Sequence, residues 1–176
     1  MLYKLGNPLD KMTQVGPVIS KRSAEVIRSH VSDAISKGAK DVTPDNESFK
    51  YPPPEGNFVP PTLLIDVNHD MLVMKEETFG PVIPVMKVKN DEEAVRLMND
   101  SEFGLTASIW TKDVAKGTEL AERVEAGTVF INRCDFPSPD LAWTGWKNSG
   151  KGVTLSRFGF EQFVKLKSFH IKDHPR

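Results

Sequence analysis

Residues 145–152, GWKNSGKG, come within one residue of G-x-x-x-x-G-K-[ST], the pattern of a loop that binds nucleotide phosphates. Such a loop needs glycines that let backbone N–H groups converge, a lysine for the phosphates and a Ser or Thr hydroxyl for Mg²⁺. Gly152 stands where the hydroxyl is needed. The preceding strand is expected to end near Asn132, and the following VTLSRFGF is a poor helix start. The spacing therefore argues against a phosphate site and favours a turn-rich surface loop, here called the glycine-rich loop.

A nucleophilic thiol is the next chemistry to consider. Cys134, in INRCDFP, is the single cysteine of the chain, and it is flanked by Arg133 and Asp135. The two flanking charges could polarise the thiol, but they offset each other in net charge. A small, half-buried side chain is the simpler interpretation of Cys134.

Metal binding and carboxylate chemistry find little support. No two histidines stand at ligand spacing, so no metal site is expected. The four are His30, His69, His170 and His174. Glu76 and Glu77 are sequence neighbours, whose side chains would point apart in an extended segment. They are therefore not expected to act as a general acid and base.

Composition excludes several classes of protein. The 176 residues are 27% charged and 39% hydrophobic, with 23 basic and 24 acidic residues and a net charge of -1. This balance predicts no nucleic-acid partner. No apolar run approaches the roughly 20 residues of a membrane helix, and the first residues do not resemble a secretory signal. A single cysteine agrees with a reducing compartment, so we expect a cytoplasmic protein.

The elements that must position these residues begin with a helix. Ser20 is its expected N-cap and Gly38 its C-cap. Its apolar residues at helical spacing are Ala24, Ile27, Val31, Ala34 and Ile35. Residues 44–61 contain six prolines and predict an exposed loop or extended arm.

Strands and helices then alternate. Strands are predicted at 62–67, 81–88, 105–111 and 128–132. Asn90 is expected to cap a helix over 91–100 in a capping box with Glu93, and Asp113 to start a helix that Gly127 ends. Their predicted apolar faces are Ala94, Val95, Leu97 and Met98 in the first, and Leu120, Ala121 and Val124 in the second. This order predicts an α/β fold of βαβ units with buried parallel strands. Residues 133–157 are expected to form loops, and 160–172 an imperfect strand.

Five motifs in a fixed order resemble the carboxy-terminal third of the aldehyde dehydrogenase superfamily. They are GNPLDKMTQVGPVIS (6–20), EETFGPVIPV (76–85), FGLTASIWTKD (103–113), AGTVFIN (126–132) and WTGWKNSGKG (143–152). The resemblance covers essentially the whole chain in one register. It implies the later part of a three-layer α/β catalytic domain over 1–160 and an oligomerisation arm over 161–176. The arm would join a copy of the chain or a longer homologue.

The resemblance also implies roles for particular residues. Family members oxidise aldehydes to acids with NAD⁺ or NADP⁺. Glu77 matches the glutamate that binds the nicotinamide ribose hydroxyls, and Phe79 the aromatic that packs beside the nicotinamide. The alternative is a charged turn in which Phe79 plugs the end of the sheet. Because ligands of open α/β sheets gather at the carboxyl ends of strands, we expect these two residues there, at the mouth of a cleft. A location elsewhere would favour a generic α/β domain unrelated to dehydrogenases.

The glycine-rich loop is similar to the tail of the family's P-F-G-G-x-K-x-S-G-x-G motif. Ala142, Trp143 and Thr144 depart from the family's proline, phenylalanine and first glycine. In the family that aromatic lines the substrate tunnel, so Trp143 is expected to face the substrate. Cys134 falls in a loop that borders the same tunnel.

Two functions remain open. The nucleophilic cysteine, the general-base glutamate and the dinucleotide-binding domain of the family match no part of this chain. The chain is then a portion of an aldehyde dehydrogenase that is inactive alone, or a non-catalytic pseudoenzyme or oligomerisation module built from the same fold.

Overall fold

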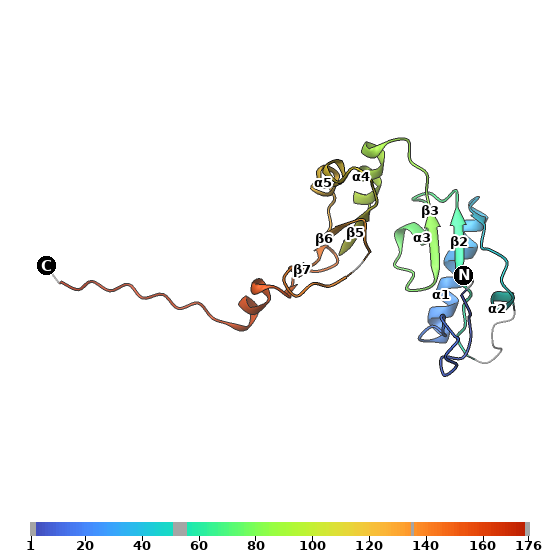
Figure 1. The fold of residues 1–176 in the computed structure, drawn as a ribbon, viewed down its shortest axis with the longest axis horizontal. Coiled ribbons are helices and arrows are strands. Elements are labelled where there is room, and N and C mark those ends of the chain that lie inside the picture. Colours follow the sequence, from blue (N-terminus) through green and yellow to red (C-terminus); the bar gives the residue numbers. More distant parts are fainter. Residues whose placement is uncertain (1–2, 51–55, 135, 175–176) are drawn as a thin grey trace. The chain divides into compact units, whose positions relative to one another are not determined.

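The computed structural model describes residues 3–50, 56–134 and 136–174 (Figure 1). The chain divides into two compact units, Met1–Lys87 and Val88–Arg176.

Unit 1 contains a three-stranded sheet and a long helix. Its elements are α1 (Lys21–Ser36), β1 (Lys40–Asp41), α2 (Glu47–Lys50), β2 (Thr62–Ile65), α3 (Leu72–Lys75) and β3 (Val82–Val85). The strand order is β1-β2-β3, with β1 antiparallel to β2 and β2 parallel to β3. Thr62 stands opposite Val82, so the two parallel strands start level with one another.

The first helix forms as its sequence predicts. The Ser20 side chain accepts a hydrogen bond from the backbone N–H of Ser23, and Gly38 leaves the helix with a φ of 104°. Ile27 and Ala34 are fully buried. Ile35 was expected on the same apolar stripe but is 47% exposed, because it lines an open cavity together with Asp41 and Thr62.

The core of unit 1 lies between α1, α3 and the sheet. Leu64 and Met71 are fully buried, and they pack with Ala34, Val67 and Val73. The short helix α3, which the sequence analysis missed, supplies this core from the crossover between β2 and β3. Four residues are too few for a helical period to be recognised.

The proline-rich segment is less exposed than expected. Residues 47–50 form α2, and Phe58 and Val59 are 8% and 4% exposed. Val59 packs with Ala24 and Ile27 of α1. The prediction of an exposed arm over 44–61 is therefore wrong at these positions; residues 51–55 lie outside the described residues.

Unit 2 contains the second parallel pair. Its elements are α4 (Asp91–Asn99), β4 (Phe103–Gly104), β5 (Thr106–Ile109), α5 (Val114–Ala121), β6 (Thr128–Ile131), β7 (Trp143–Thr144), β8 (Trp146–Lys147), β9 (Val153–Thr154) and the 3-10 helix η1 (Arg157–Phe163). β5 and β6 are parallel, joined through α5, while β4–β8 and β7–β9 are antiparallel. The predicted α/β class with parallel strands is confirmed.

The cap of α4 forms as predicted, but its buried face is smaller than predicted. Asn90 caps it by accepting a hydrogen bond from the Glu93 N–H at 2.9 Å. The Glu93 carboxylate reaches back to the N–H of Lys89 at 2.6 Å, so the predicted capping box closes one residue earlier than expected. Val95 is buried, but Met98 is 39% exposed, so the predicted buried face is narrower than the sequence suggests.

The second predicted helix and the carboxy-terminal segment also differ from expectation. Asp113 caps α5, but this helix ends at Ala121 rather than at Gly127. The segment predicted as loop carries the two-residue strands β7, β8 and β9. Residues predicted to begin a terminal strand lie in η1. The described residues beyond it, 164–174, are exposed and extended without forming a strand in this chain (Figure 1).

Candidate functional site

Glu77 and Phe79 lie together on the loop that leads from α3 into β3, residues 76–81, here called the 76–81 loop. Both side chains are exposed. The backbone N–H of Thr62, the first residue of β2, donates to the carbonyl of Pro81 at 2.8 Å. The loop therefore lies at the amino ends of β2 and β3, and the expectation that these residues lie at the carboxyl ends is wrong. The crossover through α3 brings the chain back to the start of the sheet before β3 begins.

Phe79 has an exposed side chain and an unfavourable backbone conformation. Its φ is 45°, in the left-handed region, and 80% of the residue is exposed. A non-glycine residue in such a conformation costs on the order of 1–3 kcal/mol and persists only where its surroundings hold it. The ring therefore does not plug the end of the sheet, and packing of the ring does not explain its conformation.

The 76–81 loop contacts α1 at two points. His30 Nδ1 and Thr78 Oγ1 lie 3.1 Å apart and share a hydrogen bond. Gly80 approaches the same helix so closely that a Cβ there would lie 2.4 Å from Ile27 Cδ1. His30 is only 5% exposed. The residues on either side of Phe79 are thus fixed to α1 while its ring projects into solvent.

Asp33 fixes the chain before the loop. Its carboxylate accepts a hydrogen bond from the N–H of Leu72 at 2.8 Å and pairs with Lys37 at 2.8 Å. The Lys37 ammonium, then the Leu72 N–H, hold the pKa of Asp33 below its ordinary value. Lys37 also donates to the carbonyl of Asp70 at 2.8 Å. The start of α3 is therefore fixed to α1 by charged groups.

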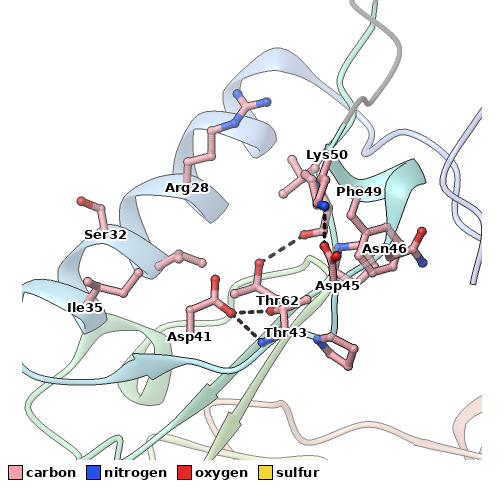
Figure 2. Close-up of a pocket in the computed structure, with 15 residues that line it drawn as sticks. Arg28, Ser32, Ile35, Asp41, Thr43, Asp45, Asn46, Phe49, Lys50 and Thr62 are labelled. Atoms are coloured by element: carbon pink, nitrogen blue, oxygen red, sulfur yellow. Dashed lines mark hydrogen bonds and ion pairs between the residues drawn. The ribbon is translucent and has the colours of Figure 1, made fainter. Parts of the chain in front are cut away.

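A separate cavity of about 540 Å³ is lined by Arg28, Ser32 and Ile35 of α1, and Figure 2 shows it. Its cations already have partners: Arg28 donates to the carbonyl of Phe58 at 3.1 Å, and Lys50 pairs with Asp45 at 2.8 Å. Asp41 accepts hydrogen bonds from Thr43 (Figure 2). Each of these charged side chains therefore has a partner within the chain, and the residues of the 76–81 loop do not line the cavity.

Cys134 and Trp143 belong to unit 2. Cys134 is exposed and follows β6, whereas Trp143 is half-buried in β7, opposite Thr154 of β9. Cys134 was expected to be half-buried, and that expectation is wrong. The Arg133 guanidinium lies over the Phe136 ring, 4.6 Å from its centroid. Asp135, the other expected neighbour of the thiol, lies outside the described residues.

The glycine-rich loop is held as a structural turn. Lys147 Nζ donates to the carbonyl of Asn99 at 2.7 Å and pairs with Glu125 at 2.7 Å. Ser149 Oγ accepts from the N–H of Gly104 at 3.0 Å. The strand β9 follows the loop, where a phosphate loop would open a helix. This geometry agrees with the interpretation drawn from the spacing.

In residues 3–50, 56–134 and 136–174, no three His, Cys, Asp or Glu side chains gather as a metal site would require. Over the same residues, no helix combines the length and apolar character that crossing a bilayer demands.

The chain belongs to the aldehyde dehydrogenase family, whose model matches residues 2–169. An aldehyde dehydrogenase of Paenarthrobacter nicotinovorans is 42% identical, over 93% of this chain and 35% of its own length. The mitochondrial succinate-semialdehyde dehydrogenase of Rattus norvegicus is 38% identical over 93% of this chain and 31% of its own.

Solved structures agree. An aldehyde dehydrogenase of Mycobacterium tuberculosis complexed with NAD⁺ superposes with a TM-score of 0.83 at 33% identity, over 93% of this chain and 33% of that one. Betaine aldehyde dehydrogenase of Staphylococcus aureus in complex with NAD⁺ gives 0.80 at 34% identity, over 91% and 32%. The chain thus spans about a third of the length of the curated relatives it matches.

His30 and Thr78 are the contacts that sequence reasoning did not find. His30 stands among Ala24, Ile27 and Ala34 on the apolar stripe of α1, and a histidine on such a stripe is a signal of a buried polar contact. The identity of its partner could not be read from the sequence, because Thr78 lies far along the chain.

Proposed function

We propose that this chain supplies the nicotinamide-facing part of an NAD(P)⁺-dependent aldehyde dehydrogenase. Glu77 would accept two hydrogen bonds from the diol of the nicotinamide ribose, which a carboxylate is suited to do. Phe79 would pack beside the nicotinamide ring, restrict its orientation and exclude water. The bound cofactor would supply the acceptor for the hydride of the aldehyde.

One observation carries this proposal: Phe79 is a large aromatic, 80% exposed, in a left-handed backbone conformation. Stability alone would favour a glycine or a small polar residue there. Strained residues cluster where a ligand is bound. Its neighbour Glu77 is exposed on the same loop, so a ribose and a flat ring could be contacted together.

We further propose that Trp143 and Cys134 border the aldehyde. Trp143 replaces the phenylalanine of the family motif, and its larger ring would narrow the space left for substrate. Cys134 would contribute a small wall residue and not the nucleophile, which belongs to a part of the family that this chain does not match.

A chimera tests the proposal directly. The matching third of the Paenarthrobacter nicotinovorans enzyme is replaced by this chain, and aldehyde-dependent formation of reduced cofactor is followed by absorbance. We expect turnover in the chimera, and a higher KM for NAD⁺ when Glu77→Gln is introduced. Trp143→Phe should change the ranking of aldehydes by size and leave the KM for NAD⁺ unchanged. A folded chimera whose KM for NAD⁺ is insensitive to Glu77→Gln contradicts the assignment.

The alternative function, an oligomerisation module, draws support from residues 164–174. Leu166 is 98% exposed and Ile171 76% exposed on an extended segment that forms no strand among the described residues. Extended apolar segments are ready to pair with a sheet of another molecule. We propose that this segment joins a second copy or a longer relative. Light scattering should show an assembly that Leu166→Asp dissociates, whereas a monomeric wild-type chain would contradict the proposal.

A further inference from the structure

One face of α1, together with its C-cap residue Lys37, contacts the chain from Asp70 to Gly80 at four successive positions. Lys37 donates to the Asp70 carbonyl, Asp33 accepts from the Leu72 N–H, His30 shares a hydrogen bond with Thr78, and Ile27 packs against Gly80. Residues three or four apart lie on one side of a helix. The segment therefore runs antiparallel to α1 along a single stripe of that helix.

The four contacts differ in chemistry. Asp33 and Lys37 are charged and partly exposed, and their hydrogen bonds fix the start of α3. The contact at Ile27 is steric and leaves Gly80 no room for a side chain. The hydrogen bond between His30 and Thr78 is the one that involves a nearly buried polar side chain. Such a group is costly to leave unpaired, so its partner is held firmly in place.

Thr78 lies between the two residues proposed to bind the cofactor. It is half-buried, whereas Glu77 and Phe79 on either side of it are exposed. Because Thr78 is joined by peptide bonds to both neighbours, its hydrogen bond to His30 restrains the backbone from which the Glu77 and Phe79 side chains project. A movement of Thr78 away from α1 would rotate both neighbours together.

We propose that His30 is a positioning residue: through Thr78 it holds Glu77 and Phe79 in the orientation that receives the nicotinamide ribose and ring. This inference rests on the proposed function of the 76–81 loop. His30 itself is buried and contacts the loop through Thr78, so it would not touch the cofactor.

Matched substitutions of Thr78 test the hydrogen bond without disturbing the core around His30. Thr78→Val keeps the shape of the side chain and removes the hydroxyl, whereas Thr78→Ser keeps the hydroxyl and removes the methyl group. Thr118→Val, which removes an exposed hydroxyl from α5 in unit 2, controls for the loss of a threonine hydroxyl elsewhere. All variants are made in the full chain and labelled with ¹⁵N.

Backbone order parameters of Glu77 and Phe79 provide a measurement that needs no cofactor. We expect values near 0.85, typical of rigid backbone, in the wild type and in Thr78→Ser, and below about 0.6 in Thr78→Val. The ¹⁵N resonance of His30 Nδ1 should shift in Thr78→Val and stay near its wild-type position in Thr78→Ser. The Thr118→Val control should resemble the wild type in both respects.

The opposite ranking overturns the inference. If Thr78→Ser loosens the loop and Thr78→Val does not, methyl packing positions it and His30 does not. A loop that stays rigid in both variants, or is mobile in the wild type, also refutes the role of His30. A titration with nicotinamide mononucleotide separates this inference from the proposed function. A loop that follows the expected ranking but does not respond to the mononucleotide refutes the cofactor assignment alone. When both hold, Thr78→Val should weaken mononucleotide binding by about three- to tenfold, as the loss of one hydrogen bond would.

Discussion

Replacing Phe79 by glycine and, in parallel, by alanine separates the two properties of this residue, its left-handed backbone and its exposed ring. Both substitutions remove the ring, and only glycine adopts a φ of 45° without steric cost. A comparison of the two variants therefore isolates the backbone contribution. A comparison of either variant with the wild type measures what the ring adds to stability and to cofactor binding.

The structure sets the expected magnitudes. A side chain in the left-handed region costs about 1–2 kcal/mol, and the greater freedom of glycine in the unfolded chain offsets about 0.5–1 kcal/mol of that gain. Phe79→Gly should thus be more stable than Phe79→Ala by about 0.5–1 kcal/mol. Because Phe79 is 80% exposed, losing the ring should cost only about 0.5 kcal/mol, a small part of what burial of a phenylalanine contributes.

Urea denaturation followed through the amide NMR signals of β2 and β3 measures the free energy of unfolding of unit 1. We expect Phe79→Gly to be as stable as the wild type or slightly more stable, and both variants to lose affinity for nicotinamide mononucleotide. If Phe79→Ala proves the more stable variant, the backbone is not left-handed at this position. If Phe79→Ala costs several kcal/mol, the ring is buried and is not available to a ligand.

Three further predictions concern the supporting structure. Asp33→Asn should destabilise unit 1 at neutral pH. The pKa of Asp33 is lowered in the folded chain, so the stability that its carboxylate contributes is present above its unfolded-state pKa and is lost as the pH falls through its folded-state pKa. The urea midpoints of the wild type and the variant should therefore converge from about pH 5 downward. Gly127→Ala places a Cβ 1.6 Å from the Thr144 carbonyl oxygen and should cost unit 2 about 3 kcal/mol, read by tryptophan fluorescence, whereas Gly152→Ala should be nearly neutral. Ser20→Ala removes the cap of α1 and should cost about 1 kcal/mol in urea denaturation; an unchanged midpoint would contradict the cap.

Features set by neighbouring residues could be predicted from the sequence. Ser20, Asn90 and Asp113 cap their helices as expected, since a cap depends on a side chain and an N–H three residues away. The strands at 62–65 and 128–131 were also expected, because short apolar runs between turn signals are typical of buried parallel strands.

Features set by distant contacts could not be predicted. The amino-end location of the 76–81 loop depends on the crossover through α3, and α3 depends on packing of Met71 and Val73 in the core. The hydrogen bond between His30 and Thr78 joins residues 48 positions apart. Motif resemblance predicted a cofactor-binding role for Glu77 and Phe79, whereas the contacts that hold their loop became visible only in three dimensions.

The central claim is that Glu77 and Phe79 contact the nicotinamide half of the cofactor. A ¹H–¹⁵N titration of the full chain with nicotinamide mononucleotide, with adenosine monophosphate as the control, tests it most directly. We expect shifts concentrated at residues 77–80 with the nicotinamide compound, abolished by Glu77→Gln, and none there with the adenine compound. Equal shifts with both compounds, or shifts confined to other residues, would contradict the claim.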